Sequence, residues 1–305
     1  MKTGFVGIVG RPNVGKSTLL NAILGEKIAI TTAKPQTTRN AIRGIYTDYD
    51  YGDDGIQMVF IDTPGIHKPR NKLGEFMTDA AIGTFNEVDA IIFIVDDRLS
   101  GGPGDRYIVD LLKDIETPKI LVINKIDRME PDEYAAIYSE YDELGMFDAI
   151  FGTSAIDGTH VDDVIGSVAQ YMEDGPMYFP DDIVTENPVR FIVSEIIREK
   201  ILLYLQDEVP HGVAVEIESF EEPTDEEMAA GRGVTRIGAV IYCERKSHKG
   251  MIIGKGGRKL KGIGKAAREE IQGLLGTKVF LQTWVKVKEN WRDSDIALSN
   301  FGYKE

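Results

Sequence analysis

The stretch Gly10-Arg11-Pro12-Asn13-Val14-Gly15-Lys16-Ser17 matches the pattern G-x-x-x-x-G-K-[S/T], which wraps the phosphates of a nucleoside triphosphate. The apolar run at residues 4–9 predicts a buried parallel strand before it, and the apolar spacing at residues 19–23 predicts a helix after it. In that context the backbone N–H groups and the positive helix end form an anion site. Lys16 then reaches the outer phosphates, and the hydroxyl of Ser17 can bind Mg²⁺.

The chain has 305 residues, which is enough for about two domains, each with its own core. Its single cysteine, Cys243, excludes an internal disulfide framework and is expected to be a small core residue in a reducing compartment. The first strand starts at once, without a signal segment, and no uncharged apolar run approaches the ~18 residues of a membrane span. We therefore expect a cytoplasmic protein that is neither exported nor membrane-spanning.

The formal charge of −15 is distributed unevenly along the chain. Residues 1–184 hold 31 acidic and 16 basic side chains, whereas residues 185–305 hold 19 of each, so the whole excess lies in the first part. Residues 245–268 contain nine Lys or Arg and no Asp or Glu, a density unusual for a merely solvated face. Because nucleic-acid binding depends on Lys and Arg, we expect it in the second part of the chain only.

Three further motifs each follow an apolar strand. Residues 57–61 lead into Asp62-Thr63-Pro64-Gly65, whose Asp can hold Mg²⁺ through water and whose glycine can donate its N–H to a terminal phosphate. Residues 119–123 lead into Asn124-Lys125-Ile126-Asp127, whose Asp can accept from N1–H and the exocyclic amine of guanine, a pattern that adenine lacks. The backbone of Ser154-Ala155 can close on the guanine O6. Ligands of open α/β sheets bind at the carboxyl ends of strands, so the motifs predict one guanine-nucleotide site.

The segment between the phosphate loop and the next strands has no steady apolar period. Residues 28–43, with Pro35-Gln36-Thr37-Thr38-Arg39 at their centre, are rich in Thr, Ala and Lys and predict a mobile loop. Strands are expected at residues 42–47 and 57–61, joined by a hairpin connection, and again at residues 90–95.

The motifs in this order resemble the Era and TrmE branch of the translation-factor-like GTPases. The resemblance implies a Ras-like P-loop domain of the α/β class, with a mixed, mostly parallel sheet and helices on both faces. It also implies a GTP site made of the residues in the four motifs, namely Gly10, Asn13, Val14, Gly15, Lys16, Ser17, Thr18, Asp62, Thr63, Pro64, Gly65, Asn124, Lys125, Asp127, Ser154 and Ala155.

Within that site the resemblance assigns the catalytic roles to Lys16, Thr38 and Gly65. It assigns Mg²⁺ to Ser17, Thr38 and Asp62. The neighbouring Thr37 stays open as an alternative metal ligand, although Thr38 is preferred. The resemblance further suggests that Asn13 binds K⁺ beside the phosphates and so replaces an arginine finger.

Ile66 occupies the position after the D-x-x-G glycine, where Ras-like enzymes carry a glutamine that orients the attacking water. An aliphatic side chain cannot polarise water, so we expect slow intrinsic hydrolysis. The alternative is that Gln36 or His67 takes over the task of the glutamine.

A boundary follows, because residues 174–182 combine two prolines, a glycine and three Asp residues and break any periodic pattern. We expect a GTPase domain at residues 1–172, a linker at residues 173–188, a second domain at residues 189–290 and a tail at residues 291–305.

The second domain is expected to run helix, strand, strand, helix, strand. The elements are a helix at 189–205, strands at 212–220 and 235–243, an acidic solvated loop at 221–233, a helix with Ile263, Ala267, Ile271 and Leu274 on its inner face, and a strand at 278–287. The loop Gly254-Lys255-Gly256-Gly257 fits G-x-x-G and opens the second helix. Trp291 after the last strand is expected to fill the core, with stacking on a base as the alternative.

This order resembles the type II KH domain, an α+β fold whose G-x-x-G loop and adjoining groove hold about four unpaired nucleotides. The resemblance implies RNA-binding residues in and around the loop, namely Lys249, Ile253, Gly254, Lys255, Gly256, Gly257, Arg258, Lys259 and Lys261.

Over the whole chain the resemblance implies a monomeric GTP-hydrolysing switch that binds the single-stranded 3′ end of 16S rRNA and acts in assembly of the 30S ribosomal subunit. It also implies peripheral contact with the inner membrane face, for which the sequence shows no amphipathic basic helix. Alternatives are a nucleotide-stabilised RNA-binding adaptor without turnover and a GTPase of RNA modification. The latter lacks a feature here, since Cys243 lies in a predicted strand and not at a reactive C-terminus.

Overall fold

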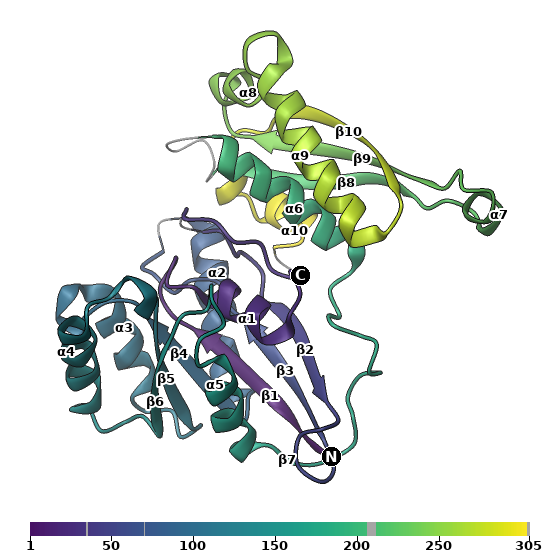
Figure 1. Cartoon of the computed structure of the whole chain (residues 1–305). Coiled ribbons are helices and arrows are strands. Elements are labelled where there is room, and N and C mark those ends of the chain that lie inside the picture. Colours follow the sequence, from purple (N-terminus) through teal and green to yellow (C-terminus); the bar gives the residue numbers. More distant parts are fainter. Residues whose placement is uncertain (35, 70, 206–211, 304–305) are drawn as a thin grey trace. The chain divides into compact units, whose positions relative to one another are not determined.

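The computed structural model describes residues 1–34, 36–69, 71–205 and 212–303. Pro35 in the expected mobile loop and the last two residues of the expected tail lie outside these ranges. The chain forms two compact units (Figure 1). The first comprises Met1–Arg70 and Gly74–Asn187, and the second comprises Asn71–Leu73 and Pro188–Glu305.

The first unit is built on a mixed sheet in the order β2-β3-β1-β4-β5-β6. The strands are β1 (Lys2–Val9), β2 (Ile42–Asp48), β3 (Ile56–Asp62), β4 (Ala90–Val95), β5 (Lys119–Asn124), β6 (Ala149–Thr153) and the short β7 (Glu173–Asp174). Among the named strands of this sheet, as far as the structure describes them, β2 on β3 and β7 on β1 are antiparallel and the other pairs are parallel. β3, β4 and β5 are buried along their whole length, which explains why most of their residues are apolar.

Helices cover both faces of this sheet, as expected. They are α1 (Lys16–Leu24), α2 (Lys72–Gly83), α3 (Pro103–Leu112), α4 (Pro131–Asp142) and α5 (Val161–Val168), with short 3₁₀ turns η1 (Thr84–Asn86), η2 (Leu99–Gly101), η3 (Ile126–Arg128) and η4 (Ala169–Tyr171). Side chains of α2, α3 and α4 join one core cluster with alternate residues of β4 and β5. α1 and α5 contact each other on the opposite face. Because the phosphate-loop motif enters α1 directly from β1, it lies at the carboxyl edge of the parallel strands.

Most of the expected linker, residues 173–188, lies along the first unit. β7 pairs with the start of β1, and the side-chain oxygen of Gln57 accepts the backbone N–H of Tyr178 at 2.8 Å. Further on, the N–H of Ile45 in β2 donates to the carbonyl of Val184 at 2.8 Å. The segment that leads to the second unit is therefore held at the outer edge of β2.

The second unit is a three-stranded sheet in the order β10-β9-β8, with β8 antiparallel and β10 parallel to the central strand. Its elements are α6 (Val189–Tyr204), β8 (Val213–Glu221), α7 (Asp225–Ala229), β9 (Val234–Cys243), α8 (Lys246–Ile253), η6 (Lys255–Gly257), α9 (Arg258–Leu275), β10 (Lys278–Val287), η7 (Trp291–Asp293) and α10 (Asp295–Asn300). α6, α8 and α9 bury their apolar residues against the inward residues of the strands.

Three expectations for this unit are corrected by the structure. Leu274 is 41% exposed instead of facing the core, because it lies one position off the stripe of Ile263, Ala267 and Ile271. The acidic loop between β8 and β9 contains a helix, α7, which Thr224 starts with a capping box. α8 precedes the G-x-x-G loop and was not expected, since its apolar residues stand together at its C-terminal end and form no stripe with helical spacing.

Two side chains settle smaller expectations. Cys243 is fully buried in the core of the second unit, as expected of a small core residue. Trp291 is also fully buried and donates its indole N–H to the carbonyl of Gly212 at 2.9 Å, so it fills the core and has no face free for a base. In the part of the chain that the structure describes, none of the helices combines the length and apolar character needed to cross a bilayer.

Candidate functional site

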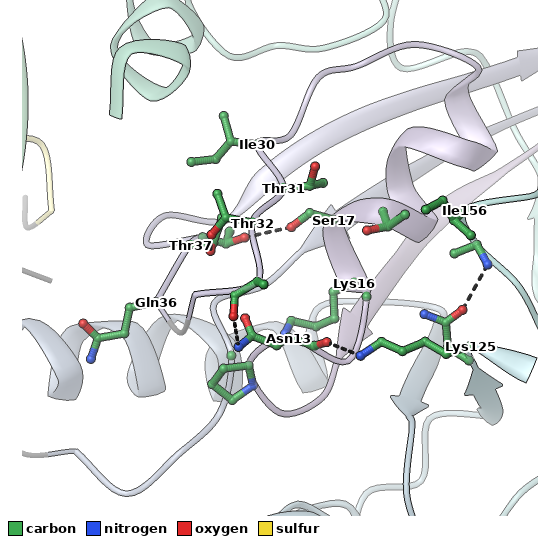
Figure 2. A pocket seen from close by; sticks show the side chains of 18 of the residues that line it. Asn13, Lys16, Ser17, Ile30, Thr31, Thr32, Gln36, Thr37, Lys125 and Ile156 are labelled. Atoms are coloured by element: carbon green, nitrogen blue, oxygen red, sulfur yellow. Dashed lines mark hydrogen bonds between the residues drawn. The ribbon is translucent and has the colours of Figure 1, made fainter. Parts of the chain in front are cut away.

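The expected nucleotide residues meet around one pocket of the first unit, where β1, β3 and β5 end (Figure 2). Those that line it are Asn13, Gly15, Lys16, Ser17, Thr18, Thr38, Gly65, Asn124, Lys125, Asp127 and Ala155. The other expected residues do not line it, and these are Gly10, Val14, Asp62, Thr63, Pro64 and Ser154. Several of this second group are fully buried and support the lining residues from behind.

Sequence reasoning did not assign several of the lining residues to the GTP site. They are Pro12, which lies inside the phosphate-loop motif, and Ile30, Thr31, Thr32, Ala33, Arg128 and Ile156, which belong to no motif. Thr37, the alternative metal ligand, and Gln36, a candidate substitute for the glutamine, also line the pocket. Arg128 and Ile156 directly follow recognised motifs, so adjacency could have found them. Residues 30–33 could not be found, because the sequence around them carries no periodic signal.

The phosphate loop is tightly folded around Gly15 and Lys16. Gly15 has φ 110°, and a Cβ there would lie 2.1 Å from the side-chain nitrogen of Asn124, so no larger residue fits. The ammonium group of Lys16 donates to the carbonyls of Gly10 at 3.2 Å and Arg11 at 2.9 Å. Burial lowers the pKa of Lys16 to about 8, although Asp62 and Asp96 oppose this. A buried, poorly compensated ammonium group is well suited to receive a phosphate oxygen.

Beside it, three oxygen-bearing side chains from three different elements converge. The hydroxyl of Ser17 donates to Asp62 Oδ2 at 2.6 Å and lies 2.8 Å from the hydroxyl of Thr38. Thr38 also donates to the same carboxylate oxygen at 3.3 Å. Thr37 points elsewhere, donating to the carbonyl of Lys34 at 2.6 Å. Of the two threonines, the structure brings only Thr38 to this group of oxygens.

Asp62 lacks full compensation for its charge. Its Oδ1 is buried and has no hydrogen-bond partner among the described residues. Burial raises the pKa of Asp62 to about 6, even though Lys16 and the hydroxyls of Ser17 and Thr38 favour the charged form. A buried carboxylate with an open oxygen and two adjoining hydroxyls is a donor set that fits Mg²⁺.

The guanine motifs form the other end of the pocket. The side chain of Asn124 donates to the carbonyl of Val14 at 2.8 Å and accepts the N–H of Ala155 at 3.0 Å, so it ties the phosphate loop to the Ser-Ala loop. Lys125 has φ 67° and donates to the carbonyl of Asn13 at 2.7 Å (Figure 2). Asp127 accepts from the hydroxyl of Ser154 at 2.9 Å. The Asp127 carboxylate is thereby oriented at the pocket wall.

Ile66, which stands where Ras-like enzymes have a glutamine, and the two candidate substitutes, Gln36 and His67, lie in different surroundings. Ile66 is 1% exposed and packs in the core, so its side chain does not reach the pocket. Gln36 lines the pocket, and its amide nitrogen lies 3.5 Å from His67 Nε2. His67 Nδ1 in turn lies 3.0 Å from the carbonyl of Gly65. The two residues weighed as substitutes for the glutamine therefore adjoin each other.

A second hollow lies in the second unit, between α9 and the free edge of β10. It is lined by Gly257, Arg258, Leu260, Lys261, Gly262, Gly264, Lys265, Arg268, Phe280, Leu281 and Thr283. The G-x-x-G loop forms one end of it, and Gly254, Gly256 and Gly257 all have φ between 61° and 73°. These left-handed conformations are accessible to glycine at low cost and explain the glycine content of the loop.

Of the expected RNA-binding residues, Gly257, Arg258 and Lys261 line this groove. The others lie on α8, in the loop or at the start of α9, and these are Lys249, Ile253, Gly254, Lys255, Gly256 and Lys259. Lys265, Arg268 and Phe280 were missed. Helical spacing could have found the two cations, since positions 258, 261, 265 and 268 share one face of α9.

Comparison with known proteins supports the interpretation of both units. Residues 5–125 match the family model of the 50S ribosome-binding GTPase, and residues 208–292 match that of the KH domain. The chain is 55% identical to GTPase Era of Alkaliphilus oremlandii (strain OhILAs) over 302 residues, 99% of either chain. It is also 55% identical to GTPase Era of Clostridioides difficile (strain 630) over 305 residues, 100% of this chain and 99% of the other. The chain belongs to the Era family of GTPases.

Solved structures agree over the whole length. Era in complex with MgGDPNP and nucleotides 1506-1542 of 16S ribosomal RNA has a TM-score of 0.91 at 37% identity, with 100% of both chains covered. A variant of Aquifex aeolicus Era bound to GDP.AlF4- has a TM-score of 0.90 at 36% identity and the same coverage. The expected fold class, a Ras-like P-loop GTPase domain followed by a KH domain, is confirmed. The chain is a GTPase, which turns GTP into GDP and phosphate.

Replacing Asp127 tests the guanine end of the pocket. Asp127→Asn removes the charged acceptor for N1–H and the exocyclic amine, so GTP affinity should fall about 100-fold, or about 3 kcal/mol. Xanthosine triphosphate, which offers an acceptor in place of the amine, should then bind better than GTP. Titration calorimetry measures the affinity of the wild type and the variant for both nucleotides and so shows which one each protein prefers.

The matched control is Asp132→Asn on the exposed start of α4, which removes the same charge away from the pocket. A variant at position 127 that still prefers GTP contradicts the assignment.

Proposed function

We propose that this GTPase is an RNA-binding switch whose KH unit holds the single-stranded 3′ end of 16S rRNA, and that it acts in assembly of the small (30S) ribosomal subunit. One observation carries the proposal: the chain combines the guanine-nucleotide pocket with a separate basic groove beside a G-x-x-G loop. The solved Era complex that contains 16S ribosomal RNA shares the fold of the whole chain, which supports the choice of RNA.

In the nucleotide site we assign the catalytic roles to Lys16, Thr38 and Gly65. Lys16 reaches the β- and γ-phosphates, and the N–H of Gly65 donates to the γ-phosphate. The converging oxygens of Ser17, Thr38 and Asp62 would hold Mg²⁺, with the carboxylate acting through water. When bound, the ion supplies positive charge that neutralises the phosphate oxygens. The remaining motif residues orient the nucleotide.

The groove of the second unit suits a single strand in charge and in shape. Arg258, Lys261, Lys265 and Arg268 are exposed along one face of α9, and no acidic residue lines the groove among the described residues. Phe280, 51% exposed, offers a ring face on which a base can stack. The glycine loop lets the sugar–phosphate backbone approach closely. Together these features favour unpaired RNA over a protein partner.

The two activities are linked through the segment that precedes β2 and contains Ala33 and Thr38, here called the switch segment. Thr38 lies four residues before β2. The hydrogen bond between Ile45 and Val184 attaches β2 to the connector, the segment of residues 173–187 that leads to the second unit. The γ-phosphate would keep Thr38 and Gly65 in place, and hydrolysis would release them. A change at Thr38 is thereby passed along the chain to the segment that ends at α6 of the KH unit.

We further propose that Asn13 helps to hold K⁺ beside the phosphates. Asn13 has φ 68° and donates from its side chain to the carbonyl of Ala33 at 2.9 Å, so it joins the phosphate loop to the switch segment. A cation placed there would neutralise charge between the β- and γ-phosphates, as an arginine finger does. The need for such help follows from Ile66, which cannot orient water.

The proposal includes a cytoplasmic, monomeric protein. The buried single thiol, Cys243, is compatible with a reducing compartment. Peripheral contact with the inner membrane face rests on the family resemblance alone.

RNA binding is tested by changing the loop and the charges separately. Gly254→Asp places a Cβ 2.7 Å from that of Lys259 at φ 70° and adds a negative charge, so affinity for an oligonucleotide of the 16S 3′ end should fall at least about tenfold. The double variant Lys255→Ala, Arg258→Ala leaves the backbone unchanged. It should reduce the slope of log K against the logarithm of the salt concentration by about 1.4, because it removes two phosphate contacts. Fluorescence anisotropy at several salt concentrations measures both.

Lys113→Ala, an exposed lysine of the first unit, is the control and should leave RNA affinity unchanged. GTP affinity should stay constant in all three proteins. RNA affinity at the wild-type level in both loop variants would refute the assignment of the groove.

The cation proposal has its own test. Hydrolysis under single-turnover conditions should be at least about tenfold faster in KCl than in NaCl, because K⁺ contributes part of what an arginine finger supplies. Asn13→Ala should lower the rate in KCl to that in NaCl. Equal wild-type rates in the two salts contradict the proposal.

A further inference from the structure

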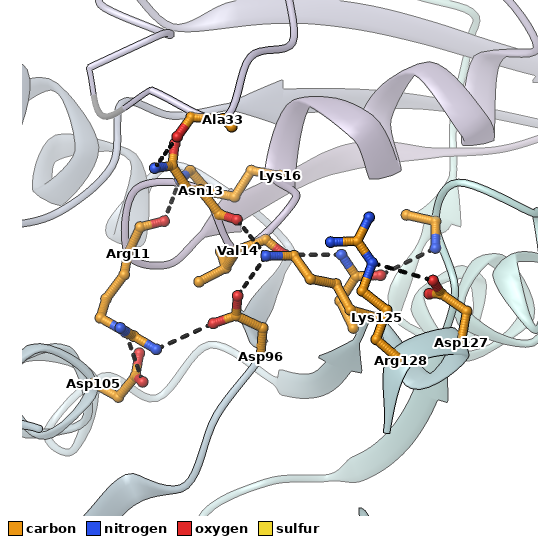
Figure 3. A network of polar contacts seen from close by, with 12 residues as sticks. Arg11, Asn13, Val14, Lys16, Ala33, Asp96, Asp105, Lys125, Asp127 and Arg128 are labelled. Carbon is orange, nitrogen blue, oxygen red and sulfur yellow. Dashed lines mark hydrogen bonds and ion pairs between the residues drawn. The ribbon is translucent and has the colours of Figure 1, made fainter. Parts of the chain in front are cut away.

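Asp96 lies directly after β4, outside the nucleotide pocket, and bridges two loops of the site (Figure 3). One of its oxygens, Oδ1, lies 3.2 Å from Nη2 of Arg11 in the phosphate loop. The other, Oδ2, lies 2.5 Å from Nζ of Lys125 in the guanine motif. A single carboxylate thus holds both loops, and the sequence motifs gave no reason to expect it.

The Arg11 end of this bridge is anchored to α3. Nε of Arg11 lies 2.7 Å from Oδ2 of Asp105, whose side chain is 3% exposed. Gly104 provides the space, since a Cβ there would lie 2.5 Å from Cδ of Arg11. The carbonyl of Arg11 also accepts the Lys16 ammonium group at 2.9 Å. Arg11 therefore connects α3 to the lysine that serves the phosphates.

The Lys125 end of the bridge reaches the nucleotide pocket. Lys125 lines the nucleotide pocket, and its ammonium group is shared between Asp96 and the carbonyl of Asn13. The side chains of Arg11 and Lys125 are 30% and 31% exposed and that of Asp96 is 20% exposed, so water screens these charges only in part. Without the carboxylate, two cations would face each other across the gap and repel.

We infer that Asp96 is a positioning residue, which locks the phosphate loop to the guanine loop and thereby slows the release of the bound guanine nucleotide. The inference rests on the proposed nucleotide site. A loop already held in its binding geometry loses less conformational entropy when the nucleotide binds, and such pre-organisation acts mainly on the dissociation rate. Asp96 does not line the nucleotide pocket, so the chemical step does not depend on it directly.

The test is Asp96→Asn, which keeps the shape and removes the charge. Release of a fluorescent GDP and of a fluorescent non-hydrolysable GTP analogue, measured by stopped flow, should each be about tenfold faster, as expected for a partly screened carboxylate that serves two cations. KM for GTP should rise by a similar factor, while the single-turnover rate at saturating GTP stays within about twofold of wild type. Asp97→Asn, the exposed neighbour, is the matched control and should behave as wild type.

A double-mutant cycle with Lys125→Met separates positioning from a general effect on stability. If Asp96 acts through Lys125, Asp96→Asn should change the release rate by less than about twofold in the Lys125→Met background. Additive effects, or release from Asp96→Asn at the wild-type rate, would overturn the inference. The assignment of the nucleotide site is tested separately, because it would be refuted by an Asp127→Asn variant that still prefers GTP.

Discussion

The carboxylate of Asp62 is the contact on which the switch depends. It is buried at the end of β3 and accepts from both Ser17, at the start of α1, and Thr38, in the segment before β2. Three elements far apart in sequence thus meet at one incompletely compensated charge. A cation and a γ-phosphate stabilise this meeting point, and their loss weakens it. We therefore propose that the nucleotide state changes the order of the segment that leads into β2.

We propose that the KH unit responds as well, because the chain leaves the first unit beside the same strand. Residues 173–187 lie along the first unit, and the bond between Ile45 and Val184 fixes them to β2. A linker that was free from residue 173 onward would insulate the two activities from each other. Because residues 173–187 are instead attached to β2, a change in the nucleotide bound in the pocket can reach them through that strand. On this account the GTPase reaction times how long the groove beside α9 keeps its RNA.

The sequence predicted the parts of the molecule that local rules control. Parallel strands such as β4 and β5 need apolar residues on both faces, and the motif residues follow them, so the strands and the pocket could be read together. Contacts between segments that are distant in the sequence could not be predicted in this way. Asp96 belongs to no motif, Phe280 is adjacent to the basic face of α9 only after β10 has paired, and Ile30 reaches the pocket from a segment without periodicity. α8 was not expected because its apolar residues form no stripe with helical spacing.

We propose that GTP and RNA stabilise the same state of the protein. Coupling between two binding sites is reciprocal, so each ligand must change the affinity for the other by one common factor. The direct measurement is the affinity for the 16S 3′-end oligonucleotide in the Mg²⁺ complexes of a non-hydrolysable GTP analogue and of GDP, paired with the affinities for both nucleotides with and without RNA. We predict tighter RNA binding with the analogue, by about tenfold, and the same factor in the nucleotide affinities. Equal RNA affinity in the two nucleotide states would contradict the account.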